Sequence, residues 1–303
     1  MNRREFLRNS AKIGAGVAIA GSPLWSVGGE AGALTILYTN DWHSRIDPFP
    51  LDGGRYEGLG GASKRAALIE KVRRNSANVI LLDAGDIFQG TPYFNYFGGE
   101  LEFKLMSAMR YDAATLGNHD FDAGMDGLKK QLKHASFEIL NANYDFSDTM
   151  LKDTFRASKV FRKGPWKIGV IGVGIDLQNL VPDEHYGATR YTDPIAAANR
   201  EADYLKNKKK CDLVICLSHL GYEYRSEKVS DIQLAKNSEN IDVILGGHTH
   251  TFLREPVILK NKSEKNIRVC QTGWAGINLG KIDYEAHTIS TAANPHSSML
   301  KIC

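Results

Sequence analysis

Cysteine, proline and long apolar runs are all scarce in this sequence. Four cysteines in 303 residues are too few for a disulfide-stapled miniprotein, and nine prolines leave room for regular helices and strands. No stretch reaches the roughly 20 apolar residues that span a bilayer, which excludes a polytopic membrane protein. Neither sign of charge dominates, with 38 Lys and Arg against 35 Asp and Glu. A hydrophobic content of 43% can build a sizeable core, which excludes a disordered chain.

Residues 1–33 look separate from the folded domain. Paired arginines at positions 3 and 4 stand before two apolar residues, and an Ala- and Gly-rich stretch follows over residues 11–20. This order resembles a twin-arginine export signal, which the twin-arginine export machinery reads to carry folded proteins across the bacterial inner membrane. We therefore expect a periplasmic protein. Small residues allow cleavage after Ala20 or Ala33, and an uncleaved signal would tether the protein to the membrane.

Bulk charge gives no support to a nucleic-acid-binding surface. Residues 1–33 hold four of the 38 bases and two of the 35 acids, so the rest of the chain has 34 bases and 33 acids. A protein that binds nucleic acid normally carries an excess of positive charge. We expect no nucleic-acid partner.

Short apolar runs alternate with amphipathic stretches of helical period. β-Branched runs predict buried strands, and apolar residues recurring three or four positions apart predict helices. The predicted strands are Leu34–Tyr38, Val79–Leu82, Ala113–Leu116, Leu213–Leu217 and Val243–Leu245, and the predicted helices are Ala62–Arg74, Leu101–Arg110, Met125–His134, Pro194–Lys208 and Lys228–Lys236. This alternation favours parallel strands with helices outside.

Other segments depart from this alternation. Two hairpins are predicted, from Lys159–Phe161 with Lys167–Val173 and from Pro256–Leu259 with Ile267–Gln271, and Gly280–Glu285 is a further strand. These strands are too many for one comfortable open sheet. We therefore expect an α/β fold with two stacked mixed sheets between helical layers. The predicted boundaries are a signal over 1–33, a folded domain over 34–292 and an unpacked C-terminal tail over 293–303.

Polar clusters follow five predicted strands at the point where each strand ends. They are Asn40–His43, Asp83–Asp86, Gly117–Asp120, Ser218–His219 and Gly246–His250. Ligands of open α/β sheets gather at the carboxyl ends of the strands. Carboxylate and imidazole groups without thiolate suit divalent Mn, Zn, Fe, Co or Mg. Two neighbouring cations need a bridging carboxylate, and Asp86 is the natural one. The clusters therefore indicate a two-metal hydrolase.

The order and spacing of these motifs resemble the calcineurin-like metallophosphoesterases. The motifs that show this resemblance are Asp41-x-His43, Gly85-Asp86-x-x-Gln89, Gly117-Asn118-His119-Asp120, the isolated His219 and Gly247-His248-Thr249-His250. Gly90-Thr91-Pro92 and Asn118-His119-Asp120-Phe121-Asp122 look most like the catalytic domain of bacterial periplasmic 5′-nucleotidases and UDP-sugar hydrolases. The resemblance covers residues 34–284 and implies a four-layer α/β/β/α sandwich.

The resemblance also implies a ligand set. One metal would be held by Asp41, His43, Asp86 and His250, and the second by Asp86, Asn118, His219 and His248. His119, held by Asp120 as a catalytic dyad, would act beside the phosphate as a cation or proton donor. Gln89 would lie behind the ligands and orient them.

The activity that follows is metal-dependent hydrolysis of phosphomonoesters. A hydroxide bridging the two cations would attack in line with the leaving alcohol, and 5′-nucleotides or similar small phosphorylated metabolites are the expected substrates. The alternatives are a phosphodiesterase acting on cyclic nucleotides or UDP-sugars, and a non-catalytic subunit that binds a partner. Two-domain nucleotidases have a further C-terminal domain that supplies the nucleoside pocket. We expect either a separate protein with such a nucleotide-binding domain or a preference for compact esters.

Overall fold

The computed structural model describes residues 32–286 and 295–303. The predicted export signal lies outside the described residues, apart from Gly32 and Ala33. Within the described part of the chain, no helix combines the length and the apolar character needed to cross a membrane.

Six strands form the first sheet, in the order β14-β13-β1-β2-β3-β4. Strands β1 to β4 run parallel, whereas β13 pairs antiparallel with both β1 and β14. The bounds are β1 Leu34–Thr39, β2 Val79–Asp83, β3 Ala113–Thr115, β4 Glu138–Leu140, β13 Asn278–Tyr284 and β14 His296–Lys301.

The second sheet also has six strands, in the order β11-β12-β10-β9-β7-β6. Its four inner strands are parallel, and the edge strands β6 and β11 are antiparallel to their neighbours. The bounds are β6 Ser158–Lys163, β7 Trp166–Gly174, β9 Leu213–His219, β10 Val243–Gly246, β11 Val257–Lys260 and β12 Asn266–Cys270. A small sheet pairs β5 Tyr144–Asp145 with β8 Arg190–Tyr191.

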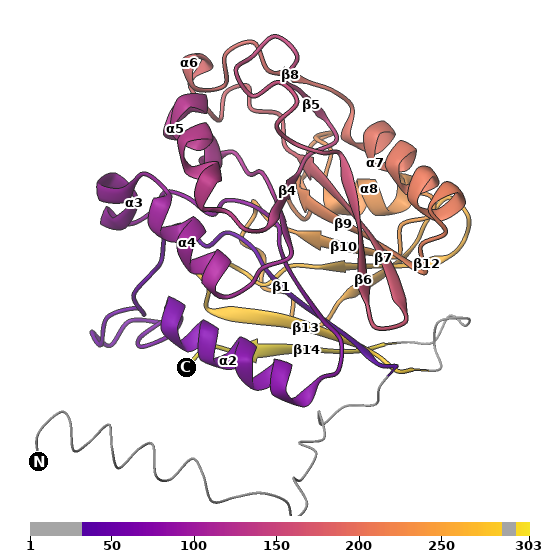
Figure 1. Ribbon diagram of the computed structural model, residues 1–303, viewed down its shortest axis with the longest axis horizontal. Helices are drawn as coiled ribbons and strands as arrows, with labels where there is room; N and C mark the ends of the chain where they lie inside the picture. Colours follow the sequence, from indigo (N-terminus) through magenta and orange to yellow (C-terminus); the bar gives the residue numbers. More distant parts are fainter. Residues whose placement is uncertain (1–31, 287–294) are drawn as a thin grey trace, which may run out of the picture.

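Helices cover the outer faces of the two sheets, with α2 and α4 on one side of the strands and α7 on the other (Figure 1). The helices are α2 Ala62–Asn75, α3 Pro92–Phe97, α4 Glu100–Ala108, α5 Gly124–Gln131, α6 Asp183–Tyr186, α7 Pro194–Asp203 and α8 Asp231–Asn237, the 3-10 helices η1 His119–Phe121 and η2 Leu132–His134, and the π-helix η3 Tyr204–Lys208, which continues α7.

Alternating side chains on each strand separate the protein into layers. Ile36 and Ile80 pair across β1 and β2 and point into the core between the two sheets. Their neighbours Leu37 and Leu81 point the opposite way and pack against α2 and α4. A third core lies between the second sheet and helices α7 and α8. The predicted α/β fold with two stacked mixed sheets is therefore confirmed as a four-layer α/β/β/α sandwich.

The predicted elements are present with shifted ends. The predicted helix over Lys228–Lys236 starts at Asp231, because the Ser230 side chain caps it by accepting a hydrogen bond from the Gln233 amide at 3.3 Å. The predicted helix over Pro194–Lys208 widens to a π-helix after Asp203. Strand β4 was not predicted, since its three residues are too few to show a period.

The prediction of an unpacked C-terminal tail over 293–303 is wrong for residues 295–303. Strand β14 pairs with β13 along its whole length. Ile302 is 1% exposed, and its amide donates to the Ile277 carbonyl at 2.9 Å while its own carbonyl accepts from the Gly60 amide at 2.9 Å. The error has a physical cause, because the polar sequence of β14 carries no strand signal and its backbone partners lie in β13, beyond the intervening residues 285–295.

Candidate metal centre

Loops at the carboxyl ends of the parallel strands bring the predicted ligands together. Asp41 follows β1 and Asp86 follows β2, while His219 ends β9. Two groups result, Asp41 with His43 and His250, and Asp86 with His219 and His248. Within each group the ligand atoms all lie within 4.8 Å of one another. This spacing allows each group to surround one metal ion.

The first group points three ligand atoms at one another. Nε2 of His43 lies 2.9 Å from Nε2 of His250, and His250 Nε2 lies 3.4 Å from Oδ1 of Asp41. Burial lowers the pKa of His43, against the opposing effect of Asp86 and Asp41. A neutral imidazole keeps a lone pair free for a metal ion.

The second group is held by hydrogen bonds from behind. His219 donates from Nδ1 to the Ala84 carbonyl at 2.7 Å, which directs Nε2 toward Oδ2 of Asp86 at 3.1 Å. Nδ1 of His248 lies 2.8 Å from Oδ1 of Asn118. Burial, with a further contribution from His219, lowers the pKa of His248 to about 4, so this imidazole is neutral.

Asp86 lies between the two groups. Its Oδ2 is 3.9 Å from His43 Nε2 in the first group and 3.1 Å from His219 Nε2 in the second. Its Oδ1 accepts a hydrogen bond from the His119 amide at 2.8 Å. The structure thus brings together all the residues predicted as metal ligands, Asp41, His43, Asp86, Asn118, His219, His248 and His250.

Five of the ligand residues have a left-handed backbone conformation. The φ angles of Asp41, His43, Asp86, His248 and His250 are 50°, 51°, 53°, 71° and 53°. Non-glycine residues seldom adopt this left-handed region, which costs about 1–3 kcal/mol per residue and recurs at functional sites. Asn118, by contrast, has an ordinary right-handed φ of −68°. The strain argues that these loops are shaped for the site rather than for stability.

The residues present fit a pair of divalent cations. Nε2 of His219 is fully buried and makes no hydrogen bond within the described part of the chain, although Asp86 Oδ2 is close. Burial opposes the protonation of His219, yet Asp86 and Asp41 raise its pKa to about 10. The field of these carboxylates would equally attract a metal ion. Nitrogen and oxygen donors without sulfur suit Mn, Zn, Fe or Co.

The predicted pairing of His119 with Asp120 is wrong. Nδ1 of His119 lies 2.7 Å from Oδ2 of Asp122, and this hydrogen bond raises the pKa of His119 despite partial burial. The reason is the 3-10 geometry of η1, in which residues i and i+3 share one side of the helix. Asp122 is therefore a site residue that the sequence reasoning missed, although it ends the motif Asn118-His119-Asp120-Phe121-Asp122.

Asp120 organises the loops instead. Its carboxylate is buried and accepts hydrogen bonds from four backbone amides, those of Asp86 at 3.1 Å, Ile87 at 3.0 Å, Phe88 at 3.2 Å and Gly117 at 2.8 Å. Burial and the Asp86 charge raise its pKa to about 7. Asp120 thus joins the loop after β2 to the loop after β3.

Residues other than the predicted Gln89 support the ligands. Gln89 is exposed in a left-handed turn with φ 63°, and no hydrogen bond joins it to the ligands among the residues described. Two unpredicted residues do contact ligands. Asn40 donates to Asp41 Oδ2 at 2.5 Å, and the Trp274 ring stacks on His250 with centroids 5.5 Å apart and planes 6° apart.

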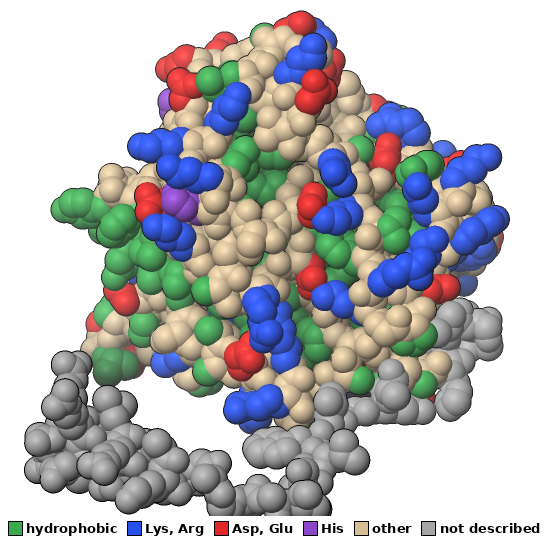
Figure 2. Space-filling view, in the orientation of Figure 1, with side chains coloured by type: hydrophobic (Ala, Val, Ile, Leu, Met, Phe, Trp, Pro, Cys, Tyr) green, Lys and Arg blue, Asp and Glu red, His purple; other side chains and the backbone are tan. Residues whose placement is uncertain are grey.

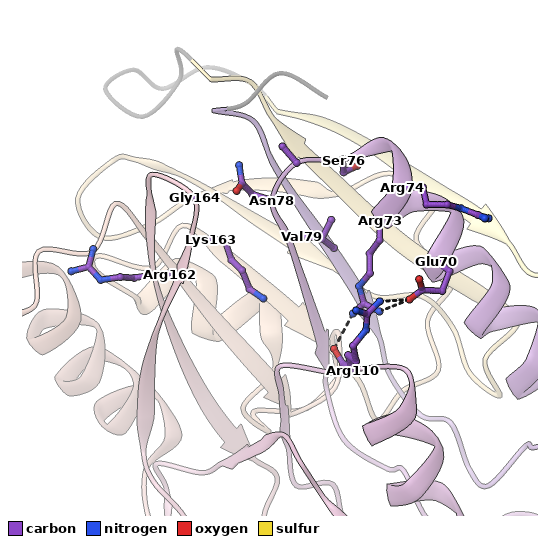
Figure 3. A pocket seen from close by; sticks show the side chains of 11 residues that line it. Glu70, Arg73, Arg74, Ser76, Asn78, Val79, Arg110, Arg162, Lys163 and Gly164 are labelled. Atoms are coloured by element: carbon purple, nitrogen blue, oxygen red, sulfur yellow. Dashed lines mark hydrogen bonds and ion pairs between the residues drawn. The ribbon is translucent and has the colours of Figure 1, made fainter. Parts of the chain in front are cut away.

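A large cavity of about 520 Å³ lies away from this centre. It is bordered by Val79 and Gly164, which stand at the amino ends of β2 and β7, the sheet edge opposite to the ligands. Lys and Arg side chains are numerous on the face of the molecule in Figure 2. In the cavity, Arg73 and Arg110 point toward Glu70 and pair with it (Figure 3).

Comparison with known proteins identifies the family. Residues 34–252 match the calcineurin-like phosphoesterase family, and the chain belongs to it. It is 32% identical to human 5′-nucleotidase over 300 residues, which is 91% of this chain and 51% of that protein. The solved structure of the 5′-nucleotidase precursor from Thermus thermophilus has a TM-score of 0.78 and 31% identity, covering 89% of this chain and 54% of that one. The structure of the NAD nucleotidase of Haemophilus influenzae has a TM-score of 0.73 and 29% identity, covering 88% of this chain and 50% of that one.

The family confirms the predicted enzyme class, a hydrolase acting on phosphate esters. It also uses divalent metals, in agreement with the two ligand groups. The chain spans about half the length of the curated relatives it matches.

Proposed function

We propose that this protein is a dinuclear metal-dependent phosphomonoesterase, acting on 5′-nucleotides or similar small phosphorylated metabolites. One observation carries the proposal. Two groups of metal-ligating atoms lie side by side, the buried Asp86 carboxylate of the second group approaches His43 of the first, and His119 lies beside them. Burying so many polar groups on strained backbone lowers the stability of the fold, and a non-catalytic scaffold would have no reason to keep them.

The chain would hold two cations through named atoms. Asp41, His43 and His250 would hold one, His219, His248 and Asn118 the other, and Asp86 would contact both. When bound, such a pair supplies Lewis acidity to phosphoryl oxygens and lowers the pKa of a coordinated water. The hydrogen bonds to His219 and Asp41 fix the direction of the ligands before any metal arrives.

His119 would act on the substrate directly. Its ring is adjacent to His43, with centroids 5.3 Å apart, and its side chain is 37% exposed. Because Asp122 binds Nδ1 and raises the pKa, the imidazole holds a proton at Nε2 that can be donated toward a phosphoryl oxygen. A positioned cation at this point stabilises the negative charge that gathers on the transferring group.

Similarity to 5′-nucleotidases supports nucleotides as substrates. The test is hydrolysis of a panel containing nucleoside 5′-monophosphates, a cyclic nucleotide, a UDP-sugar and an aryl phosphate. We expect phosphate release from the monoesters, abolished by a chelator and restored in part by Mn²⁺, Co²⁺ or Zn²⁺. Activity that survives complete removal of metal would contradict the mechanism. Hydrolysis of the diesters alone would replace it with the phosphodiesterase alternative, and no hydrolysis under any metal would favour a non-catalytic subunit.

Export to the periplasm is a second part of the proposal. It rests on the twin arginines at positions 3 and 4, which lie outside the described residues. Loading the metals before export would suit a pathway that carries folded proteins.

A further inference from the structure

A series of aromatic contacts leads from the metal centre to a neighbouring cavity. Trp274, stacked on His250, meets Phe49 and Tyr56 edge to face, with centroids 5.8 and 6.2 Å apart. Tyr56 in turn lies nearly parallel to Phe252, with planes 17° apart and centroids 6.3 Å apart. Two ring contacts therefore separate His250 from Tyr56.

Tyr56 and Phe252 form part of the wall of this cavity, whose volume is about 410 Å³. Asn278 and Lys301, which also line it, are register partners on β13 and β14. Asn278 begins β13 just before Gly280, the partner of Tyr38 near the end of β1. The cavity thus opens at the same sheet edge as the metal ligands. Its volume falls in the range of small-molecule sites, about 300–1,000 Å³.

The chemistry of the wall selects its ligand. Phe252 is 40% exposed, so part of its ring is free to meet a ligand in the cavity that it lines. The charged residues lining the cavity are Arg55, Arg254 and Lys301, and no carboxylate lines it among the described residues. Arginine and lysine donate hydrogen bonds and accept none. A planar aromatic group with acceptor atoms at its edge matches both properties.

We propose that this cavity is a base subsite, in which the base of a nucleotide substrate stacks on Tyr56 and Phe252. The inference rests on the proposed function, since it places the phosphate ester at the two ligand groups and the nucleoside beyond Trp274. The arginines then favour bases that present acceptors, such as guanine with O6 and N7, over adenine, whose amino group is a donor. The chain would in this way recognise a nucleoside with its own residues.

The test compares kcat/KM for guanosine 5′-monophosphate, adenosine 5′-monophosphate and glycerol phosphate in the full chain with metals bound. We expect F252A to lower the ratio of nucleotide to glycerol phosphate about tenfold, the usual effect of losing one stacking aromatic. Arg254→Ala should reduce the preference for guanine over adenine. Tyr204→Ala removes an aromatic ring of similar exposure, 44%, that does not line the cavity, and should leave every ratio at the wild-type value.

A binding measurement separates this inference from the proposed function. Guanosine has no phosphate to lose, so its affinity for the wild type can be measured by calorimetry even if no ester is hydrolysed. Weaker binding in F252A and in Tyr56→Ala, with unchanged melting temperatures, supports the subsite whatever the activity. Ester hydrolysis with unchanged ratios and no guanosine binding would overturn the subsite while leaving the proposed function intact.

Discussion

Residue spacing decides which acid supports His119. Asp120 is adjacent in sequence, yet the 3-10 turn carries its carboxylate to four backbone amides and brings Asp122 to the imidazole. The metal-ligating residues could be predicted because each follows an apolar strand. Asp122 could not be assigned in the same way. Its hydrogen bond to His119 depends on the 3-10 turn, which places residues three positions apart on the same side.

Substitution of Asp122 should affect turnover, whereas substitution of Asp120 should affect stability. Asp122→Asn removes the charge that keeps His119 protonated, so we expect turnover to fall about 10- to 100-fold with metal content unchanged. D120N disturbs the amide cluster and should instead lower the free energy of unfolding, by about 1–3 kcal/mol. Steady-state kinetics, metal analysis and urea denaturation of both variants check this. Loss of turnover in D120N alone, with wild-type stability, would restore the Asp120 dyad.

At the scale of elements, strands that form a continuous apolar run could be predicted and those without such a run could not. Ile36 and Leu37 point to opposite cores, so both faces of β1 are buried and its sequence is apolar on both. Strand β14 has the sequence HSSMLK, and its place at the sheet edge comes from ladder bonds to β13, more than ten residues away. The π-helix η3 is likewise invisible to a pattern of period 3.6.

The C-terminal end of the chain should contribute to stability through Ile302, which follows β14. Ile302→Ala leaves a cavity at a 1% exposed position, so we expect the free energy of unfolding to fall by about 2–5 kcal/mol. His296→Ala, at an exposed position in β14, serves as the matched control and should change little. Equal effects of the two substitutions in urea denaturation would show that the end of the chain does not belong to the core.

Over the whole molecule, stacking of two sheets brings residues from positions 41 to 250 into one centre. The order of the strands along the chain indicates that their ends converge but not which strands are neighbours. The grouping of Asp41 with His250 therefore followed from the family resemblance and not from the strand pattern. The base subsite, in contrast, required the fold. Tyr56 lies in the loop before α2 and Phe252 in the loop after β10, and only the tertiary structure shows that their rings meet.

Metal content per chain tests the central claim most directly. Protein reconstituted with Mn²⁺, freed of excess metal and analysed by plasma mass spectrometry should hold about two ions, as the two ligand groups require. Replacing His219 and His248 together by alanine should leave about one, because the group of Asp41, His43 and His250 stays intact. A wild type that holds no metal, or a double variant that still holds two ions, would contradict the account.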